Sequence, residues 1–328
     1  MKRVLLTGAT GFVGWHVVDA LAGTGVALRA LVRPTSRTGA LERHGVELVR
    51  GDLDGGAAAL ASALAGIDTV VHLAARTHAR SEAAFHETNA AATRRLLRAA
   101  RDANGPPRFV YMSSLAAAGP ARDGRPVRPA DPARPITAYG RSKRAGEVAC
   151  REMSDDLDVV VLRAPAVYGP RDREMLRFFR FARTGRVPVP AGAPRPLQFV
   201  HVSDLARAVV LAAGHADLRG IFHVAEPDAY DMHAVARLIG DAIGRRVRPL
   251  PLPAGLIHAV AAAAESAQRA LGRTSMLNRD KAREFLAPGW LCETGAARDA
   301  FGFEARIALP DGLRETAAWY TENGWLHA

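Results

Sequence analysis

The stretch KRVLLTGATGFVG, Lys2–Gly14, decides the fold of this chain. Its apolar run Val4–Leu6 predicts a buried parallel strand, and the amphipathic run Trp15–Leu21 predicts a helix. Between them stand three regularly spaced glycines, Gly8, Gly11 and Gly14. Such glycines permit a sharp turn, close approach of the backbone to phosphates, and close packing of the helix on the strand. We therefore expect a pyrophosphate at this helix N-terminus. The alternative is a tight turn that needs only flexible residues.

The glycine spacing is Gly-x-x-Gly-x-x-Gly, which differs from the Gly-x-Gly-x-x-Gly of ordinary dinucleotide-binding folds. TGATGFVG resembles the motif of the extended short-chain dehydrogenase/reductase family. That family includes NAD(P)-dependent epimerases/dehydratases and 3β-hydroxysteroid dehydrogenase-like enzymes. The resemblance implies an α/β fold, with a doubly wound parallel sheet (Rossmann) and a smaller, mainly helical C-terminal substrate lobe. It also implies that the glycine loop binds the cofactor through Gly8, Gly11, Phe12, Val13 and Gly14.

The family resemblance also predicts how the 328 residues are divided. Residues 1–164, with about 198–222, are expected to form the dinucleotide-binding domain. Residues 165–197 and 223–328 are expected to form the substrate-binding lobe. A chain of this length is long enough for one large α/β domain and a smaller lobe.

The charge balance is strongly basic, with a formal net charge of +11. All but three of the 44 basic residues are arginine, and they are scattered without basic runs or interleaved aromatics. This composition is typical of codon bias, so we expect no nucleic-acid partner. The partner expected instead is a small-molecule substrate, and a homodimer is expected from the family.

Only two cysteines occur, Cys150 and Cys292, and they are far apart. They suggest neither a disulfide framework nor a metal site, and we expect a cytoplasmic protein. Lys2-Arg3 with the apolar residues behind them faintly imitates a signal peptide, but the glycine loop interrupts that run too early. The longest other apolar stretch, Ala259–Ala264, is too short to span a bilayer.

The residues after the second predicted strand, Val26–Val32, bear on the choice of cofactor. This position faces the adenosine ribose, where an acid binds the 2′-hydroxyl of NAD and a cation accommodates the 2′-phosphate of NADP. The chain offers Arg33 and Arg37 there, and no carboxylate before Glu42. We therefore expect NADP(H) to be favoured over NAD(H). The alternative is that Arg33 is one more exposed arginine.

Further cofactor contacts are implied where the next strands end. The third strand, Val46–Val49, precedes Asp52 and Leu53, which match the family residues at the adenine edge; a turn or cap role for Asp52 is the alternative. The fourth strand, Thr69–Leu73, is followed by two small residues that let a cofactor lie close to the backbone. These are Ala74 and Ala75.

A long helix is predicted over Phe85–Ala103, and Asn89 lies early in it. Asn89 matches the family's Asn-x-x-Gly/Ala-Thr pattern, in which the asparagine helps to hold the active-site geometry. The alternative is a helix residue that bonds to the backbone.

The catalytic residues are predicted around the fifth strand, Arg108–Met112, which runs into Ser113-Ser114. Tyr139 and Lys143 follow at i and i+4, so both lie on one helix face, for which Thr137 is a plausible N-cap. A phenol is a poor base at neutral pH, and a neighbouring ammonium lowers its pKa. Tyr139 would then exchange a proton with a carbonyl oxygen while hydride moves at carbon.

Roles for the remaining residues follow from the resemblance. Lys143 is expected to stabilise the phenolate and bind the nicotinamide ribose. Ser114 is expected to orient the substrate oxygen. SSLAAAG resembles the family segment whose second serine is catalytic, so Ser113 is the alternative.

The sixth strand, Val159–Leu162, leads into RAPAVYGPRD, which resembles the family segment beside the nicotinamide carboxamide. Pro165 and Val167 match its lining residues. Beyond it we expect a proline-rich loop over Val187–Pro196. Helices are expected over Met175–Phe181, Met232–Ile243, Ala254–Leu271 and Leu313–Asn323.

The substrate expectation rests on departures from the nucleotide-sugar enzymes. These commonly carry an asparagine before Val-Tyr-Gly, which binds diphosphate, and an Arg-Asp pair before Phe-Ile-His-Val, whose arginine binds phosphate. This chain has Ala166 and Leu197-Gln198 instead, with Arg195 as a partial substitute. We therefore expect an NADP(H)-dependent oxidoreductase of a mainly apolar ketone, aldehyde or alcohol. A nucleotide-sugar 4-epimerase/dehydratase is the first alternative, and a non-catalytic NADP-binding protein is the second.

Overall fold

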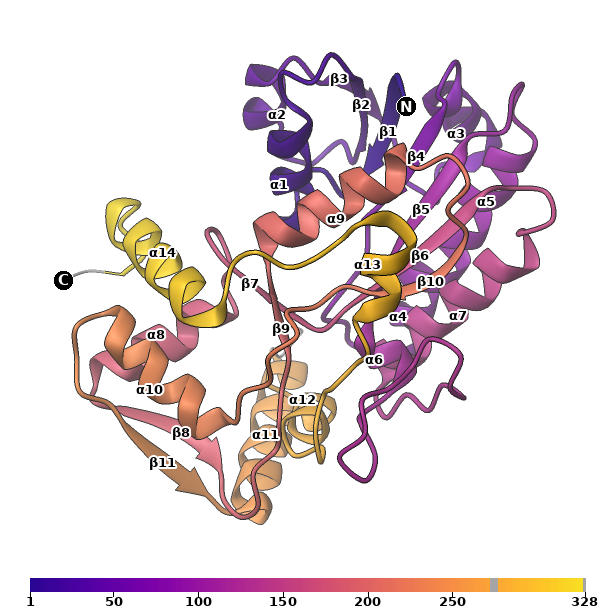
Figure 1. Cartoon of the computed structure of the whole chain (residues 1–328). Helices are drawn as coiled ribbons and strands as arrows, with labels where there is room; N and C mark the ends of the chain where they lie inside the picture. Colours follow the sequence, from indigo (N-terminus) through magenta and orange to yellow (C-terminus); the bar gives the residue numbers. More distant parts are fainter. Residues whose placement is uncertain (272–276, 327–328) are drawn as a thin grey trace.

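A seven-stranded parallel sheet forms the centre of the computed structural model, which describes residues 1–271 and 277–326 (Figure 1). Its strands are β1 Arg3–Thr7, β2 Ala27–Val32, β3 Glu47–Arg50, β4 Thr69–His72, β5 Arg108–Ser114, β6 Val159–Ala164 and β10 Gly220–His223. Their order is β10-β6-β5-β4-β1-β2-β3, so the direction of winding reverses between β1 and β4. A ligand crevice is expected at such a reversal. The doubly wound parallel sheet predicted from the sequence is confirmed.

Helices cover both faces of the sheet, because successive apolar side chains of β1 point to opposite faces and both sets must be buried. Val4 and Leu6 belong to one core and Leu5 to the other, and all three are fully buried. The first core is closed by α1 Phe12–Leu21, α9 Val202–Gly214 and α13 Gly295–Phe301. The second is closed by α3 Gly56–Leu64, α5 Ala92–Arg101 and α7 Ala138–Glu152. Two short helices, α2 Gly39–Arg43 and α6 Leu115–Ala118, complete this part.

The long helix predicted over Phe85–Ala103 is divided into three pieces. Helix α4 spans Glu82–His86, a π-helical turn η1 spans Glu87–Ala91, and α5 ends at Arg101. Ser81 caps the start, because its hydroxyl accepts a hydrogen bond from the Ala84 amide at 3.2 Å. The π turn inserts one wider turn into the helix, and Asn89 lies inside it.

The C-terminal region is mainly helical, as predicted, and includes two small sheets. Its helices are α8 Met175–Arg183, α10 Met232–Ala242, α11 Ala254–Ala270, α12 Arg279–Phe285 and α14 Leu309–Glu322. Strand β7 Ala166–Tyr168 pairs with β9 Phe199–His201, and β8 Arg186–Pro190 pairs with β11 Arg248–Leu252. The prediction of a loop over Val187–Pro196 is therefore wrong for its first residues, which belong to strand β8. Prolines fit there because each strand of a two-stranded sheet has a free edge.

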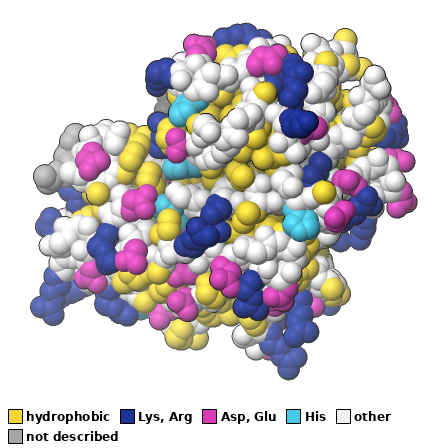
Figure 2. Space-filling model, turned by 45° about the horizontal axis from the view of Figure 1, so that its top comes forward, with side chains coloured by type: hydrophobic (Ala, Val, Ile, Leu, Met, Phe, Trp, Pro, Cys, Tyr) yellow, Lys and Arg dark blue, Asp and Glu magenta, His cyan; other side chains and the backbone are white. Residues whose placement is uncertain are grey.

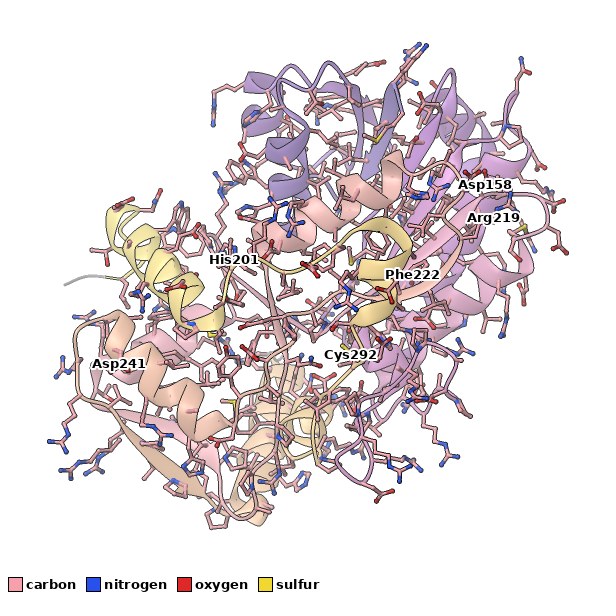
Figure 3. The ribbon with its side chains drawn as sticks, viewed as in Figure 1. Asp158, His201, Arg219, Phe222, Asp241 and Cys292 are labelled. Atoms are coloured by element: carbon pink, nitrogen blue, oxygen red, sulfur yellow. The ribbon has the colours of Figure 1, made fainter. Side chains whose placement is uncertain are left out.

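A third core lies within this C-terminal region. It joins α8, α10 and α14 through fully buried aromatic and aliphatic side chains, among them Tyr168, Phe179, Ile239, Leu313 and Tyr320. The edge of the main sheet at β10 has its own contacts. Arg219, just before β10, forms an ion pair with Asp158, and Phe222 on β10 makes an edge-to-face contact with Phe301. Figure 3 labels Asp158, Arg219 and Phe222.

Four observations concern the cysteines, the surface charges, membrane-spanning helices and metal sites. Cys150 and Cys292 are both free and buried. On the face drawn in Figure 2, Lys and Arg side chains are interspersed with Asp and Glu. Over residues 1–271 and 277–326, no helix has the length and apolar character needed to cross a membrane. Within the same ranges, no group of three or more His, Cys, Asp or Glu side chains is arranged to hold a metal ion.

Candidate active site

The glycine loop packs tightly between the end of β4 and the start of α1. Gly8 has a φ of +76°, and a Cβ there would lie 2.7 Å from the Ala74 nitrogen. At Gly14 a Cβ would lie 2.1 Å from the Gly8 carbonyl oxygen. Larger residues are therefore excluded from both positions. Helix α1 begins at Phe12, earlier than predicted, with Gly11 as its N-cap.

This start of α1 fits a dinucleotide phosphate. The amides of the first helical residues, Phe12, Val13 and Gly14, have no partner within the helix, and the helix dipole is positive at this end. No acidic side chain lies in the first turn of α1 to compete for those donors.

The residues predicted at the adenosine end are mostly exposed. Arg33 and Arg37 lie at the surface after β2. Asp52 is also exposed, and its carboxylate accepts a hydrogen bond from the amide of the buried Leu53 at 2.7 Å. Ala74 is half-buried beside Gly8. Of these residues, Ala74 follows β4, where the winding of the sheet reverses, whereas the others follow β2 and β3.

Asn89 is fully buried and fixes the loop after β4. Its side-chain oxygen accepts from the Arg76 amide at 2.7 Å, and its Nδ2 donates to the Arg76 carbonyl at 2.9 Å and to Ser142 Oγ at 2.9 Å. Ala75, the last predicted cofactor residue of this loop, is exposed just before Arg76. Asn89 therefore bonds both to backbone and to the helix that carries Tyr139, and its role in holding the active-site geometry stays a prediction.

A buried polar chain behind this loop could not be read from the sequence. Thr7 Oγ1 and His72 Nδ1 are 2.6 Å apart, and His72 Nε2 lies 2.9 Å from Thr93 Oγ1. Thr93 in turn donates to the Asn89 carbonyl at 2.9 Å. Burial, with a smaller effect from the Lys143 charge, lowers the pKa of His72 to about 3, so this histidine is neutral at physiological pH.

The Ser114 hydroxyl lies near enough to the Tyr139 phenol to lower its pKa, although the two residues come from different elements. Ser114 ends β5 and caps α6, where its Oγ accepts from the Ala116 amide at 3.1 Å. Tyr139 lies in the first turn of α7, which begins after its N-cap Thr137. Ser113 points elsewhere, because its hydroxyl donates to Glu147 at 2.6 Å. Ser113 is thus engaged away from Tyr139, and the catalytic role of Ser114 stays a prediction.

The Tyr139 phenol is held in its neutral form in this structure. Burial raises its pKa to about 12, against the charge of Lys281 and the nearby Ser114 hydroxyl, which both lower it. The ring packs edge-on against Phe85, with 6.0 Å between ring centroids. A proton donor with this pKa can give its proton to a substrate oxygen that becomes more basic during the reaction.

Lys143 is buried one turn after Tyr139. Its Nζ donates to the Met112 carbonyl at 2.6 Å and lies 4.2 Å from the centroid of the Tyr111 ring. Burial lowers its pKa to about 8, although the nearby Glu147 carboxylate works in the opposite direction. These contacts hold the ammonium at the end of β5, and its contact with the nicotinamide ribose stays a prediction.

A buried ion pair under the site was not expected from the sequence. Glu147 accepts two hydrogen bonds from Arg163, at 2.8 and 2.7 Å, and one from Ser113. Arg144 also donates to it at 3.0 Å. The spacing Tyr139, Lys143, Glu147 is a repeat of i+4 that could have placed this carboxylate on the same helix face.

Leu197 stands where the sugar enzymes carry the phosphate-binding arginine, and the polar side chains of Gln198 and Arg195 near it are hydrogen-bonded to the backbone. Gln198 is buried, and its side chain bonds the Glu226 carbonyl at 3.0 Å and the Cys292 amide at 2.6 Å. Arg195 donates to backbone carbonyls, including that of Leu286 at 3.3 Å. Pro165 and Val167 are half-buried at the link between β6 and β7, and Ala166 between them is exposed.

The family is established by comparison with known proteins. Residues 4–225 match the NAD dependent epimerase/dehydratase family. The chain belongs to this family. Its members typically use a nicotinamide dinucleotide, NAD(P), and this agrees with the extended short-chain dehydrogenase/reductase resemblance of the sequence.

Relatives in the epimerase/dehydratase family cover nearly the whole chain. A ceramide reductase of Caulobacter vibrioides (strain NA1000 / CB15N) is 33% identical over 326 residues, covering 98% of this chain and 96% of the relative. The 4-hydroxy-2-methyl-3-oxo-4-farnesyl-3,4-dihydroquinoline-1-oxide ketoreductase of Stigmatella aurantiaca is 28% identical, covering 87% and 91%. The structure of MoeE5 in complex with UDP-glucuronic acid and NAD has a TM-score of 0.78 at 27% identity, covering 98% and 100%.

Proposed function

We propose that the protein is an NADP(H)-dependent oxidoreductase that reduces a ketone or aldehyde, or oxidises the corresponding alcohol, of a mainly apolar small molecule. A bound NADP(H) supplies or takes up the hydride. Ser114 orients the substrate oxygen, Tyr139 gives it or takes from it a proton, and Lys143 binds the ribose and stabilises the phenolate. Asn89 holds the loop and helix around these groups.

The observation that carries the substrate class is that Leu197, where the sugar enzymes carry the phosphate-binding arginine, offers no cation, while the amide of Gln198 beside it is bonded to the backbone. Gln198 cannot hold a diphosphate without losing these hydrogen bonds, and Arg195 already donates through Nε and Nη1 to backbone carbonyls. Ala166, where the sugar enzymes carry an asparagine, offers no polar group. Each missing contact to a phosphate forfeits roughly 1.5–3 kcal/mol, so two losses weaken a nucleotide sugar by about two to four orders of magnitude.

The two similar reductases support the same substrate class. One is named for ceramide and the other for a farnesyl-bearing quinoline oxide, and both are mainly apolar molecules. A nucleotide-sugar 4-epimerase/dehydratase remains the second candidate, because MoeE5 is similar over the same length and binds UDP-glucuronic acid.

We assign the cofactor to residues 1–164 with about 198–222, and the substrate to residues 165–197 and 223–328. The NADP(H) preference is assigned to Arg33 and Arg37, whose exposed cations suit the 2′-phosphate.

The experiment that tests this function measures NADPH oxidation against long-chain ketones and aldehydes, with UDP, dTDP and GDP sugars titrated by calorimetry in parallel. We expect turnover of an apolar carbonyl compound and no micromolar sugar-nucleotide binding. Micromolar binding of any of the sugars would put the epimerase/dehydratase function first. Tight NADPH binding without turnover of any compound would favour the non-catalytic alternative.

A further inference from the structure

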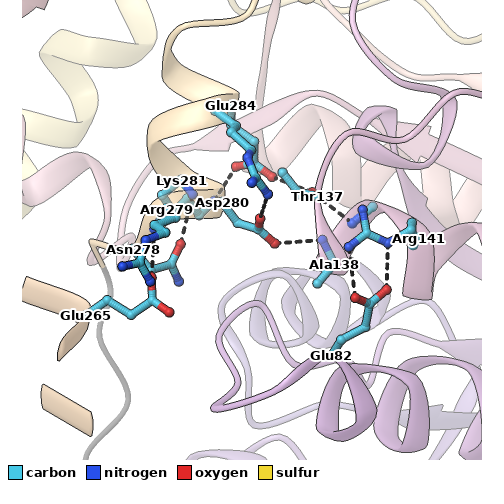
Figure 4. A network of polar contacts seen from close by, with 12 residues as sticks. Glu82, Thr137, Ala138, Arg141, Glu265, Asn278, Arg279, Asp280, Lys281 and Glu284 are labelled. Carbon is cyan, nitrogen blue, oxygen red and sulfur yellow. Dashed lines mark hydrogen bonds and ion pairs between the residues drawn. The ribbon is translucent and has the colours of Figure 1, made fainter. Parts of the chain in front are cut away.

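Helix α12 is docked on the start of the helix that carries Tyr139 (Figure 4). The Ala138 amide donates to Asp280 Oδ2 at 2.7 Å. The hydroxyl of the N-cap residue Thr137 donates to Glu284 Oε1 at 3.3 Å. Two residues of α12 thus bond the two residues that precede Tyr139.

Lys281 lies between these two contacts along α12. Its Nζ donates to Glu284 Oε2 at 2.8 Å, so one carboxylate bridges the Lys281 ammonium and the Thr137 hydroxyl. This bridge holds the ammonium at the beginning of α7. Among the described residues, Lys281 contributes the largest charge effect that favours the Tyr139 phenolate, and the tyrosine in turn favours the Lys281 ammonium.

Charged and polar groups from several elements face the same phenol. Glu284 on α12 and Glu174, which precedes α8, disfavour the phenolate, whereas the Ser114 hydroxyl at the end of β5 favours it. His78, in the loop after β4, lies 3.2 Å from Glu174, and burial lowers its pKa, against the effect of that carboxylate. Lys281 is thus the cation that offsets the two carboxylates, while Lys143 is bonded to Met112.

The composition of the chain makes this lysine unusual. Only three of the 44 basic residues are lysines, and two of them, Lys143 and Lys281, lie beside the catalytic tyrosine. An ammonium is a compact point charge, whereas a guanidinium is planar and larger. In a chain that uses arginine almost everywhere else, both positions near the phenol carry the compact cation.

We propose that Lys281 is a positioning residue of the active site, carried by α12 to stabilise the Tyr139 anion that forms when the phenol gives up its proton. In the reductive direction the phenolic O–H bond breaks, the proton moves to the substrate oxygen, and the substrate carbon receives the hydride of NADPH. The phenolate left behind then lies in the field of the Lys281 ammonium. This role rests on the proposed function, in which Tyr139 is the proton donor.

The test measures the ionisation of residue 139 itself and does not need activity. Difluorotyrosine, whose phenol is more acidic, replaces Tyr139 in the full chain, and its fluorine NMR signal is followed against pH. We expect Lys281→Met to raise the titration midpoint by about one pH unit, because an opposite charge is lost nearby. Lys281→Arg should restore most of the shift.

A matched control comes from the same helix. Arg279 pairs with Glu265 at 3.5 Å and is 53% exposed, so Arg279→Met removes one cation without touching the phenol. Its midpoint should equal that of the parent protein. An unchanged midpoint in folded Lys281→Met, or an equal shift in both variants, would overturn the proposal. If Lys281→Met fails to fold, Lys281→Gln serves instead, because it keeps a hydrogen-bond donor for Glu284.

A kinetic measurement separates this proposal from the proposed function. The pH profile of kcat/KM for alcohol oxidation should move to higher pH in Lys281→Met and return in Lys281→Arg. A midpoint shift by NMR without activity on any substrate would keep the role of Lys281 at Tyr139 and reject the oxidoreductase. An NMR midpoint and a pH profile that both stay at the parent values would reject the role of Lys281 alone.

Discussion

Asn89 and Arg76 are joined by two hydrogen bonds, one through the Arg76 amide at 2.7 Å and one through its carbonyl at 2.9 Å. The same Asn89 side chain reaches Ser142, whose hydroxyl donates to the Tyr139 carbonyl at 2.7 Å. A single amide therefore links the loop after β4, where a cofactor is expected, to the helix that carries the tyrosine. The π turn η1 is the element that aims Asn89 inward.

This link predicts the behaviour of Asn89→Ala. The substitution leaves the Arg76 amide and carbonyl without their partner, so we expect a loss of about 1–3 kcal/mol in the free energy of unfolding. Hydrogen exchange at the Arg76 amide should also accelerate. Asn323→Ala, which removes an exposed bond to the Trp319 carbonyl, is the control and should change the stability by less than about 0.5 kcal/mol. Equal losses in both variants would contradict the linking role.

Tyr139→Phe tests the proton transfer. We expect turnover to be abolished while the affinity for NADP(H) stays within a few-fold, because only the phenolic proton is lost. Lys143→Ala should weaken both turnover and cofactor binding, since the ammonium has two proposed roles. Steady-state kinetics and cofactor titration give both quantities. A Tyr139→Phe rate above about one hundredth of the wild-type rate would be inconsistent with general acid catalysis by this residue.

The exposed Arg33 allows a test of cofactor choice. We expect the wild type to bind NADPH more tightly than NADH, and Arg33→Asp to reverse that order by repelling the 2′-phosphate and accepting a ribose hydroxyl. Fluorescence titration with both cofactors measures the effect. The control is Arg219→Asp, which makes the same change of charge next to the edge strand β10. It should leave the order of the NADPH and NADH affinities unchanged. Equal wild-type affinities would refute the NADP(H) preference.

The buried pair of Glu147 and Arg163 predicts a pH-dependent stability. Burial opposes the charge on Glu147, but the hydrogen bonds and charge of Arg163, helped by Ser113 and Arg144, outweigh it and lower the pKa of the carboxyl. A lowered pKa in the folded state stabilises the protein above the ordinary glutamate value of 4.5, and the contribution is lost as pH falls through the folded value.

Glu147→Gln should therefore cost about 3–5 kcal/mol at neutral pH, because it leaves the Arg163 charge buried without a counter-charge. Urea unfolding of the wild type and of Glu147→Gln should show that the difference between their free energies of unfolding narrows as the pH falls. Glu152→Gln on the same helix breaks a half-exposed pair with Arg94 and should cost no more than about 1 kcal/mol. A gap that stays constant down to acid pH would argue against the ion pair.

Most of the sheet could be predicted from the sequence, because each buried strand is a short apolar run that ends at a glycine, proline or polar residue. The run Val4–Leu6 and the glycines behind it are a local signal of this kind. The strand β8 was missed because its pairing with β11 joins residues far apart in the chain, and its prolines favour a loop in any local view. The π turn was missed for a similar reason, since its sequence is compatible with an ordinary helix.

The candidate site was only partly visible in the sequence. Motif spacing pointed to Ser114, Tyr139 and Lys143, and the fold brings their elements together. The contacts of Asp280 and Glu284 with α7 were not visible, because no spacing rule connects residues separated by more than a hundred positions. The homodimer and the cytoplasmic location stay predictions.

The hydrogen bond from the Ala138 amide to Asp280 spans 142 positions of the chain. All seven strands of the main sheet end by His223, so the sheet can be complete on the ribosome while α12 has not yet been made. Contacts between such distant residues form late, because they need both segments to be present. A nascent chain that already holds its sheet thus still lacks the hydrogen bonds that Asp280 and Glu284 make to the start of α7.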